Sequence, residues 1–220
     1  MLHAVIHNKK AQKRGHAWTL EDNVTSTFFG SLCFLDKTDV ISLLGLCFPS
    51  SIEDLNNTYS IIEFDFWPNF KTDKGRIEPD LLIHFKNTET NSDKIDFLLL
   101  IEVKWQGYKD EHEEHQVHRQ IDAIKKHLNP ENMHAIYLTQ YDDKQKPKSK
   151  HKDVGIQCVK WIDIASQLNL PLNISDKGKY WQKCSRAYLD RLLRNVFNGF
   201  TTSDFKKVPD FENTRIFFGE

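Results

Sequence analysis

The stretch LLLIEVKWQG, residues 98–107, has four aliphatic residues that run into an acid and a base separated by one residue. An aliphatic run of this kind is typical of a buried strand. On a strand, side chains at positions i and i+2 point to the same face, so Glu102 and Lys104 would stand side by side. The stretch therefore predicts a buried strand with two neighbouring charges at its end.

The composition is that of one globular domain. The chain has 220 residues, of which 39% are apolar and 28% are charged, and this suits a folded unit rather than a disordered chain. The net charge of -1 gives no overall positive field that would attract nucleic acid. No secretory signal or membrane-spanning run is visible, so we expect a cytoplasmic protein without a membrane partner. The four cysteines form no CxxC pair and are expected to be reduced core thiols: Cys33, Cys47, Cys158 and Cys184.

Apolar periodicity predicts an α/β fold with a mixed sheet. Three strands in succession would form an antiparallel meander, after which the period changes to that of a helix. The helices are expected over 18–35, 39–47, 110–127 and 179–197, the strands over 59–67, 76–85, 95–105, 133–141 and 154–161, and a polar turn over 69–75.

Two acids lie at the ends of neighbouring predicted strands. Asp80 follows Pro79 near the start of the second strand, and Glu102 closes the third. If these strands form a hairpin, Asp80 would face Glu102 across the ladder. Two such carboxylates repel each other unless a cation lies between them, and Mg²⁺ is usually held by one or two carboxylates with phosphate and water. Lys104 beside them could orient a water or stabilise charge on a phosphate oxygen.

The pairing of EPD at 78–80 with EVK at 102–104 resembles the PD-(D/E)XK nuclease superfamily, which has the restriction-endonuclease-like fold. The resemblance covers about residues 18–140 in the order α-β-β-β-α-β. It implies a single nuclease-like domain over 1–220, in which helices flank a central mixed sheet. Residues from about 155 to 220 would then form a helical C-terminal extension.

The resemblance also implies a role for each site residue. Asp80 and Glu102 would bind Mg²⁺, for which Mn²⁺ could substitute, and Lys104 would position the nucleophilic water. An acid of the first helix completes the metal site in many members. Of the two candidates here, Glu21 shares a helix face with apolar residues and is expected to point inward, whereas Asp22 is not.

A glutamine-bearing helix follows the third strand in several branches of the family, and HQVHRQIDAI supplies Gln116 and Gln120. The resemblance implies that Gln120 supports the catalytic site. Residues four apart share a helix face, so Gln116 is a second candidate. The alternative for both is an ordinary solvated helix position.

The implied function is Mg²⁺-dependent hydrolysis of phosphodiester bonds in DNA, in phage defence, restriction, transposition or repair. Two alternatives stay open. The chain could be a nuclease subunit that is active only with a partner ATPase or transposase, or a non-cleaving nucleic-acid-binding module of the same fold. A homodimer would suit double-strand cutting.

Several charged features have simpler interpretations. Glu102 and Lys104 alone could form a surface salt bridge, which contributes little to stability. His112, His115 and His118 do not fit the H-E-x-x-H spacing of zinc peptidases and are expected on a solvated helix face. A basic loop is either solvated or a phosphate-binding arm; its lysines are Lys144, Lys146, Lys148, Lys150 and Lys152.

Overall fold

The computed structural model describes residues 20–49, 59–73, 75–87, 95–105, 113–140, 151 and 153–194. Five strands form one mixed sheet in the order β1-β4-β5-β6-β7. Their bounds are β1 Ile61–Phe66, β4 Leu81–Lys86, β5 Phe97–Lys104, β6 Asn132–Thr139 and β7 Gly155–Lys160. Strands β1, β4 and β5 pair antiparallel and form the expected meander, whereas β6 and β7 add in parallel. The prediction of an α/β fold with a mixed sheet is confirmed.

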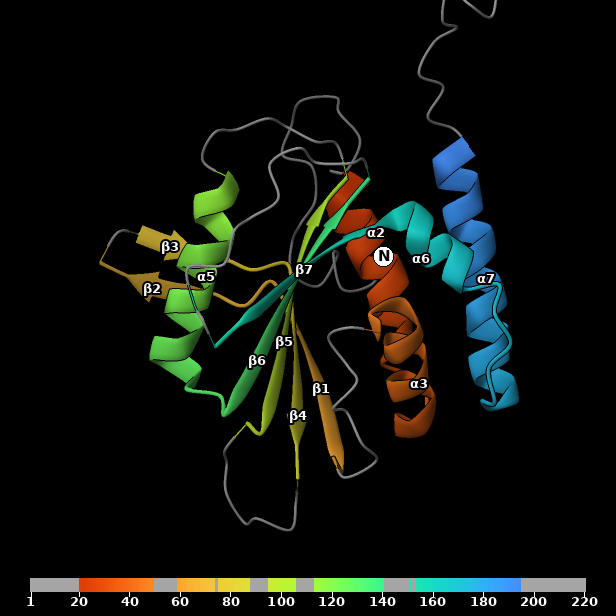
Figure 1. The fold of residues 1–220 in the computed structure, drawn as a ribbon, viewed down its shortest axis with the longest axis horizontal. Coiled ribbons are helices and arrows are strands. Elements are labelled where there is room, and N and C mark those ends of the chain that lie inside the picture. Colours follow the sequence, from red (N-terminus) through yellow and green to blue (C-terminus); the bar gives the residue numbers. More distant parts are fainter. Residues whose placement is uncertain are drawn as a thin grey trace, which may run out of the picture.

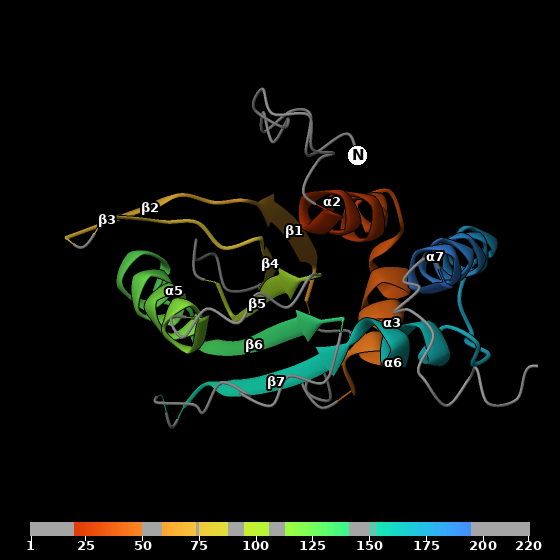
Figure 2. The same cartoon turned by 90° about the horizontal axis from the view of Figure 1, so that it is seen from above.

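Helices cover both faces of the sheet (Figures 1 and 2). Helix α5, which joins the parallel strands β5 and β6, lies on one face, and the other four helices lie on the opposite face. The helices are α2 Leu20–Leu32, α3 Lys37–Cys47, α5 Glu113–Leu128, α6 Trp161–Gln167 and α7 Asp176–Arg194. None of the described helices is long and apolar enough to cross a membrane.

Strand β5 explains the aliphatic run in the sequence, because it lies in the middle of the sheet with both faces covered. Alternate side chains, such as Leu99 and Ile101, enter the core beneath the four helices. Leu98 and Leu100 enter the second core beneath α5. Every residue of β5 except the last is buried, so the strand is a rigid support for the charges at its end.

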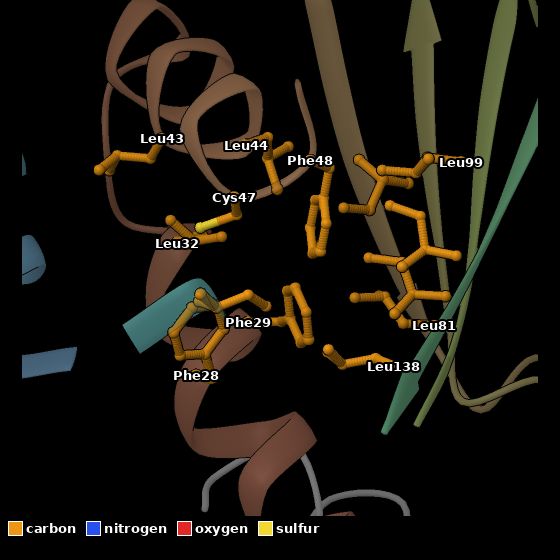
Figure 3. Close-up of a cluster of buried hydrophobic side chains, with 14 of the residues drawn as sticks. Phe28, Phe29, Leu32, Leu43, Leu44, Cys47, Phe48, Leu81, Leu99 and Leu138 are labelled. Carbon is orange, nitrogen blue, oxygen red and sulfur yellow. The ribbon is translucent and has the colours of Figure 1, made fainter. Parts of the chain in front are cut away.

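The larger core lies between the sheet and the helical layer. Figure 3 shows Phe28 and Phe29 of α2 among side chains of α3, opposite Leu81, Leu99 and Leu138 of the sheet. Helices α6 and α7 contribute to the same core: Phe28 makes edge contacts with Trp161 at 5.2 Å and with Trp181 at 5.1 Å between ring centroids. The C-terminal helices therefore pack directly on the helix that begins the described fold.

The structure corrects four expectations. The strand expected over 76–85 is interrupted at residues 78–80, so that only its second half, as β4, belongs to the main sheet. The polar turn over 69–75 is largely a hairpin of β2 (Phe70–Thr72) and β3 (Gly75–Ile77), because Phe70 and Ile77 pack on the α5 core. The strand expected over 154–161 ends at Lys160, and Trp161 begins α6 because its indole is buried under the helical layer. Of the four free cysteines only Cys47 is buried.

Candidate active site

Asp80 lies at the entrance to β4, beside the end of β5. The register pairs Leu81 with Ile101, so Asp80 falls one position further on, next to Glu102. The Val103 N–H donates a hydrogen bond of 2.8 Å to Asp80 Oδ2. The main chain of Asp80 is held too: its carbonyl accepts a hydrogen bond of 3.1 Å from the N–H of Trp67, a non-glycine residue with φ of 51°. These two contacts fix Asp80 against the sheet.

The carboxylate of Glu102 is buried and accepts hydrogen bonds from three side chains. Its Oε1 atom accepts from Lys104 Nζ at 2.6 Å and from Gln116 Nε2 at 2.7 Å. Its Oε2 atom accepts from Gln120 Nε2 at 2.8 Å. The glutamines lie one turn apart on α5, which places both amides over the end of β5. Strand β5 and the helix that follows it thereby set the orientation of one carboxylate together.

Glu21 reaches the same end of the sheet from the first turn of α2. Its Oε1 atom accepts a hydrogen bond of 3.0 Å from the main-chain N–H of Trp105, 84 positions away in the sequence. Val24 and Phe28, on the same face of the helix, are buried. The inward direction expected for Glu21 agrees with this placement.

The charges of these side chains act on one another. Burial raises the pKa of the Asp80 carboxyl well above its usual value, and the carboxylate of Glu102 adds to this effect more than that of Glu21 does. Lys104 and the Val103 N–H act in the opposite direction. Asp80 therefore shares its site with two like charges, which disfavour its ionisation.

Lys104 shows the complementary effect. Burial alone would lower its pKa, but the carboxylates of Glu102 and Asp80 outweigh burial and raise the pKa. The ammonium form of Lys104 is thus strongly favoured at neutral pH. Such a lysine can donate hydrogen bonds to water or phosphate, but it cannot accept a proton.

A divalent cation fits the chemistry of this donor set. Among the described residues, no group of three His, Cys, Asp or Glu side chains is arranged to hold a metal ion by itself. Mg²⁺ does not require such a cage, because one or two carboxylates with water and phosphate are its usual ligands. Asp80 and Glu102 supply two neighbouring carboxylates, each oxygen of which has two lone pairs. Glu21 adds a third negative charge nearby.

The other residues singled out from the sequence fall elsewhere. Gln116, the weaker candidate of the two glutamines, bonds Glu102 as Gln120 does. His118 is buried rather than on a solvated face, and its ring centroid lies 6.0 Å from that of His151. His112 lies outside the described residues, as does the lysine loop: Lys144, Lys146, Lys148, Lys150 and Lys152.

Comparisons with known proteins do not show which family the chain belongs to. No family model matches the chain, and no curated protein matches it. One similar solved structure is AF1548, a protein of unknown function, with a TM-score of 0.34 and 10% identity over 71% of this chain and 100% of that chain. Another is the small subunit (R.BspD6I2) of the heterodimeric restriction endonuclease R.BspD6I, with a TM-score of 0.24 and 13% identity over 84% of each chain. At these TM-scores neither likeness carries an argument about this chain.

Proposed function

We propose that the chain is a metal-dependent nuclease of restriction-endonuclease-like fold that hydrolyses phosphodiester bonds of DNA. One observation carries the proposal: Asp80, Glu102 and Lys104 meet at the end of a buried strand. A structural salt bridge between Lys104 and Glu102 would need no second acid beside it. The additional carboxylates make the cluster electrostatically unfavourable without a cation, which is expected of a site built for function.

Asp80 and Glu102 would hold Mg²⁺ or Mn²⁺, with Glu21 in support. When bound, the metal would polarise a phosphate oxygen and lower the pKa of a water molecule. The chain's own residues would do the positioning. Gln116 and Gln120 fix the Glu102 carboxylate, and the main-chain N–H of Val103 fixes Asp80. With both carboxylates held in this way, they would be ready to bind one metal ion together.

Lys104 would act as a fixed hydrogen-bond donor. Its ammonium group is held 2.6 Å from Glu102 Oε1, so it lies next to the proposed metal ligands. From there it would orient the attacking water and stabilise the negative charge that develops on the phosphate. Because its pKa is raised, Lys104 is not the base that removes a proton from that water.

The test is cleavage of supercoiled plasmid, linear duplex and single-stranded DNA by the purified chain in Mg²⁺ and in Mn²⁺. We expect cutting that EDTA abolishes and that Asp80→Asn and Lys104→Ala each remove while circular dichroism shows a retained fold. Asp163→Asn, an exposed acid of α6, is the matched control and should cut like wild type. Intact DNA under every metal condition would contradict a free-standing nuclease, and cutting by the Asp80→Asn variant would contradict the assigned site.

A further inference from the structure

A cleft of about 220 Å³ lies between the β2–β3 hairpin and α5. Phe70 anchors the hairpin in the core beneath α5, and its ring lies 5.5 Å from that of His127. The Lys71 carbonyl accepts a hydrogen bond of 3.1 Å from His127 Nε2. Figure 2 shows the hairpin reaching past the sheet beside this helix. The cleft therefore has two walls that are fixed to each other.

Three cationic side chains line the cleft: Arg76 from β3, and Arg119 and Lys126 from α5. All three are exposed, and within the described part of the chain none of them forms an ion pair or a side-chain hydrogen bond. Two acids also line the cleft. Asp122 already has a partner, because His151 Nε2 lies 3.3 Å from its Oδ1 atom. Asp73 lies at the hairpin turn. The cleft thus offers more positive than negative charge.

The hairpin itself carries an unfavourable arrangement of charges. Lys71 lies directly opposite Arg76 in the β2–β3 register, so both side chains point to the same face of the ribbon. Like charges in directly opposed positions destabilise a strand pair. Phe70 and Ile77 point to the α5 core, so Lys71 and Arg76 lean to the other face of the ribbon, and of these two only Arg76 lines the cleft. An anion bound by Arg76 there would lessen the repulsion between the two cations. Arginine suits a phosphate in particular, because its planar guanidinium can donate two parallel hydrogen bonds.

The hairpin and the helix that border the cleft are each connected to the candidate active site. Arg76 precedes Asp80 by four residues, which an extended chain spans in at most about 14 Å. Arg119, which is exposed, directly precedes the buried Gln120, whose side chain donates a hydrogen bond to Glu102. One strand of B-DNA carries a phosphate about every 3.4 Å along the helix axis. A phosphate bound at Arg76 would therefore lie within a few nucleotides of a phosphate at Asp80 on the same strand.

We propose that this cleft binds the sugar-phosphate backbone of the DNA next to the bond that is cut. The assignment rests on the proposed nuclease function for its substrate. The cleft holds the strand in register with Asp80 and Glu102 by contacts to phosphate, which give affinity without reading sequence. Its charge lies outside the catalytic cluster, so it acts on binding and not on the chemical step.

The test is the salt dependence of DNA binding by the full chain in EDTA, measured by fluorescence anisotropy on a labelled duplex of about 20 base pairs, two helical turns. The variant is Arg76→Gln with Arg119→Gln. Each lost phosphate contact lowers the slope of log affinity against log salt by about 0.9. We expect the slope to fall by about 2, so that between about 50 and 200 mM salt the variant loses about tenfold less affinity than wild type.

Lys183→Gln is the control, because Lys183 is an exposed lysine of α7, on the opposite face of the sheet. It should bind with the slope of wild type. An unchanged slope in the double variant overturns the inference, as does an equal change in Lys183→Gln. If the double variant does not fold, each single variant should lower the slope by about 1.

The same proteins, assayed for cutting in Mg²⁺ and in Mn²⁺, separate this inference from the proposed function. Binding that depends on Arg76 and Arg119 in a chain that cuts no DNA supports the cleft and contradicts the nuclease. Cutting that persists with an unchanged slope in the double variant supports the nuclease and overturns the cleft.

Discussion

Replacing Lys104 with methionine removes the positive charge from a cluster of three carboxylates while nearly keeping the volume of the side chain. The Lys104 ammonium lies 2.6 Å from Glu102 Oε1, and only 2% of the Glu102 side chain is exposed. Breaking a buried ion pair on one side leaves an uncompensated charge, which costs about 3–5 kcal/mol. Glu102 keeps the amide donors of Gln116 and Gln120, so we expect the lower end, about 3 kcal/mol.

A matched control exists on the surface. Lys86 and Glu63 form a pair at 2.7 Å, almost the same distance, but 54% of the Glu63 side chain is exposed. Exposed pairs contribute about 0–1 kcal/mol. Lys86→Met should therefore change the free energy of unfolding by no more than about 1 kcal/mol. The two variants differ mainly in the burial of the remaining carboxylate.

The assay is thermal unfolding followed by circular dichroism at pH 7.5 in EDTA. For a chain of this size 1 kcal/mol corresponds to about 2–4 °C in Tm. Lys104→Met should then lower Tm by about 6–12 °C, and Lys86→Met by less than about 4 °C. A Lys104→Met protein as stable as wild type, or an equal loss of Tm in both variants, would show that the buried Glu102 carboxylate does not depend on the Lys104 charge.

Three further substitutions test the structure. Asp80 has a raised pKa in the fold, so its ionised form weakens the folded state as pH rises above the ordinary value of 3.8. Asp80→Asn should therefore stabilise the metal-free protein at pH 7.5, and urea titrations should show this gain shrinking toward acid pH. At Gly178 an added Cβ would lie 2.8 Å from Asp39 Oδ2, so the overpacking cost of about 1–3 kcal/mol should exceed the gain in helix propensity of about 1 kcal/mol. Gly178→Ala should therefore lower Tm. Gly155→Ala is the control and should not lower Tm, because its Cβ would meet nothing closer than 3.4 Å. Gln120→Leu removes a buried donor to a carboxylate and should lower the free energy of unfolding by about 1.5–3 kcal/mol in urea; an unchanged urea midpoint would show that this hydrogen bond contributes nothing.

The main elements could be predicted because their signals are long. The aliphatic run that ends in Glu102 has the length of a buried strand, which the structure confirms, and α5 covers one face of that strand. The β2–β3 hairpin gave no such signal, since three-residue strands are too short to show a period. Its position depends on the contact of Phe70 with α5, which is a tertiary contact.

The candidate site, too, could be predicted from the sequence only in part. Local spacing was enough to place Glu102 beside Lys104, and the helix face was enough to turn Glu21 inward. The hydrogen bonds from Gln116 and Gln120 could not be read from the sequence, because glutamine is equally common on solvated helix faces. Only the packing of α5 against the end of β5 brings both amides to Glu102.

The most direct test of the candidate site is calorimetric titration of the metal-free chain with Mn²⁺, because it requires neither the right DNA nor a partner protein. The wild-type chain should bind Mn²⁺, and Asp80→Asn and Glu102→Gln should each weaken binding by about tenfold or more. Asp163→Asn should bind like wild type. A wild-type chain that binds no Mn²⁺, or variants at Asp80 and Glu102 that bind as tightly as wild type, would contradict the account.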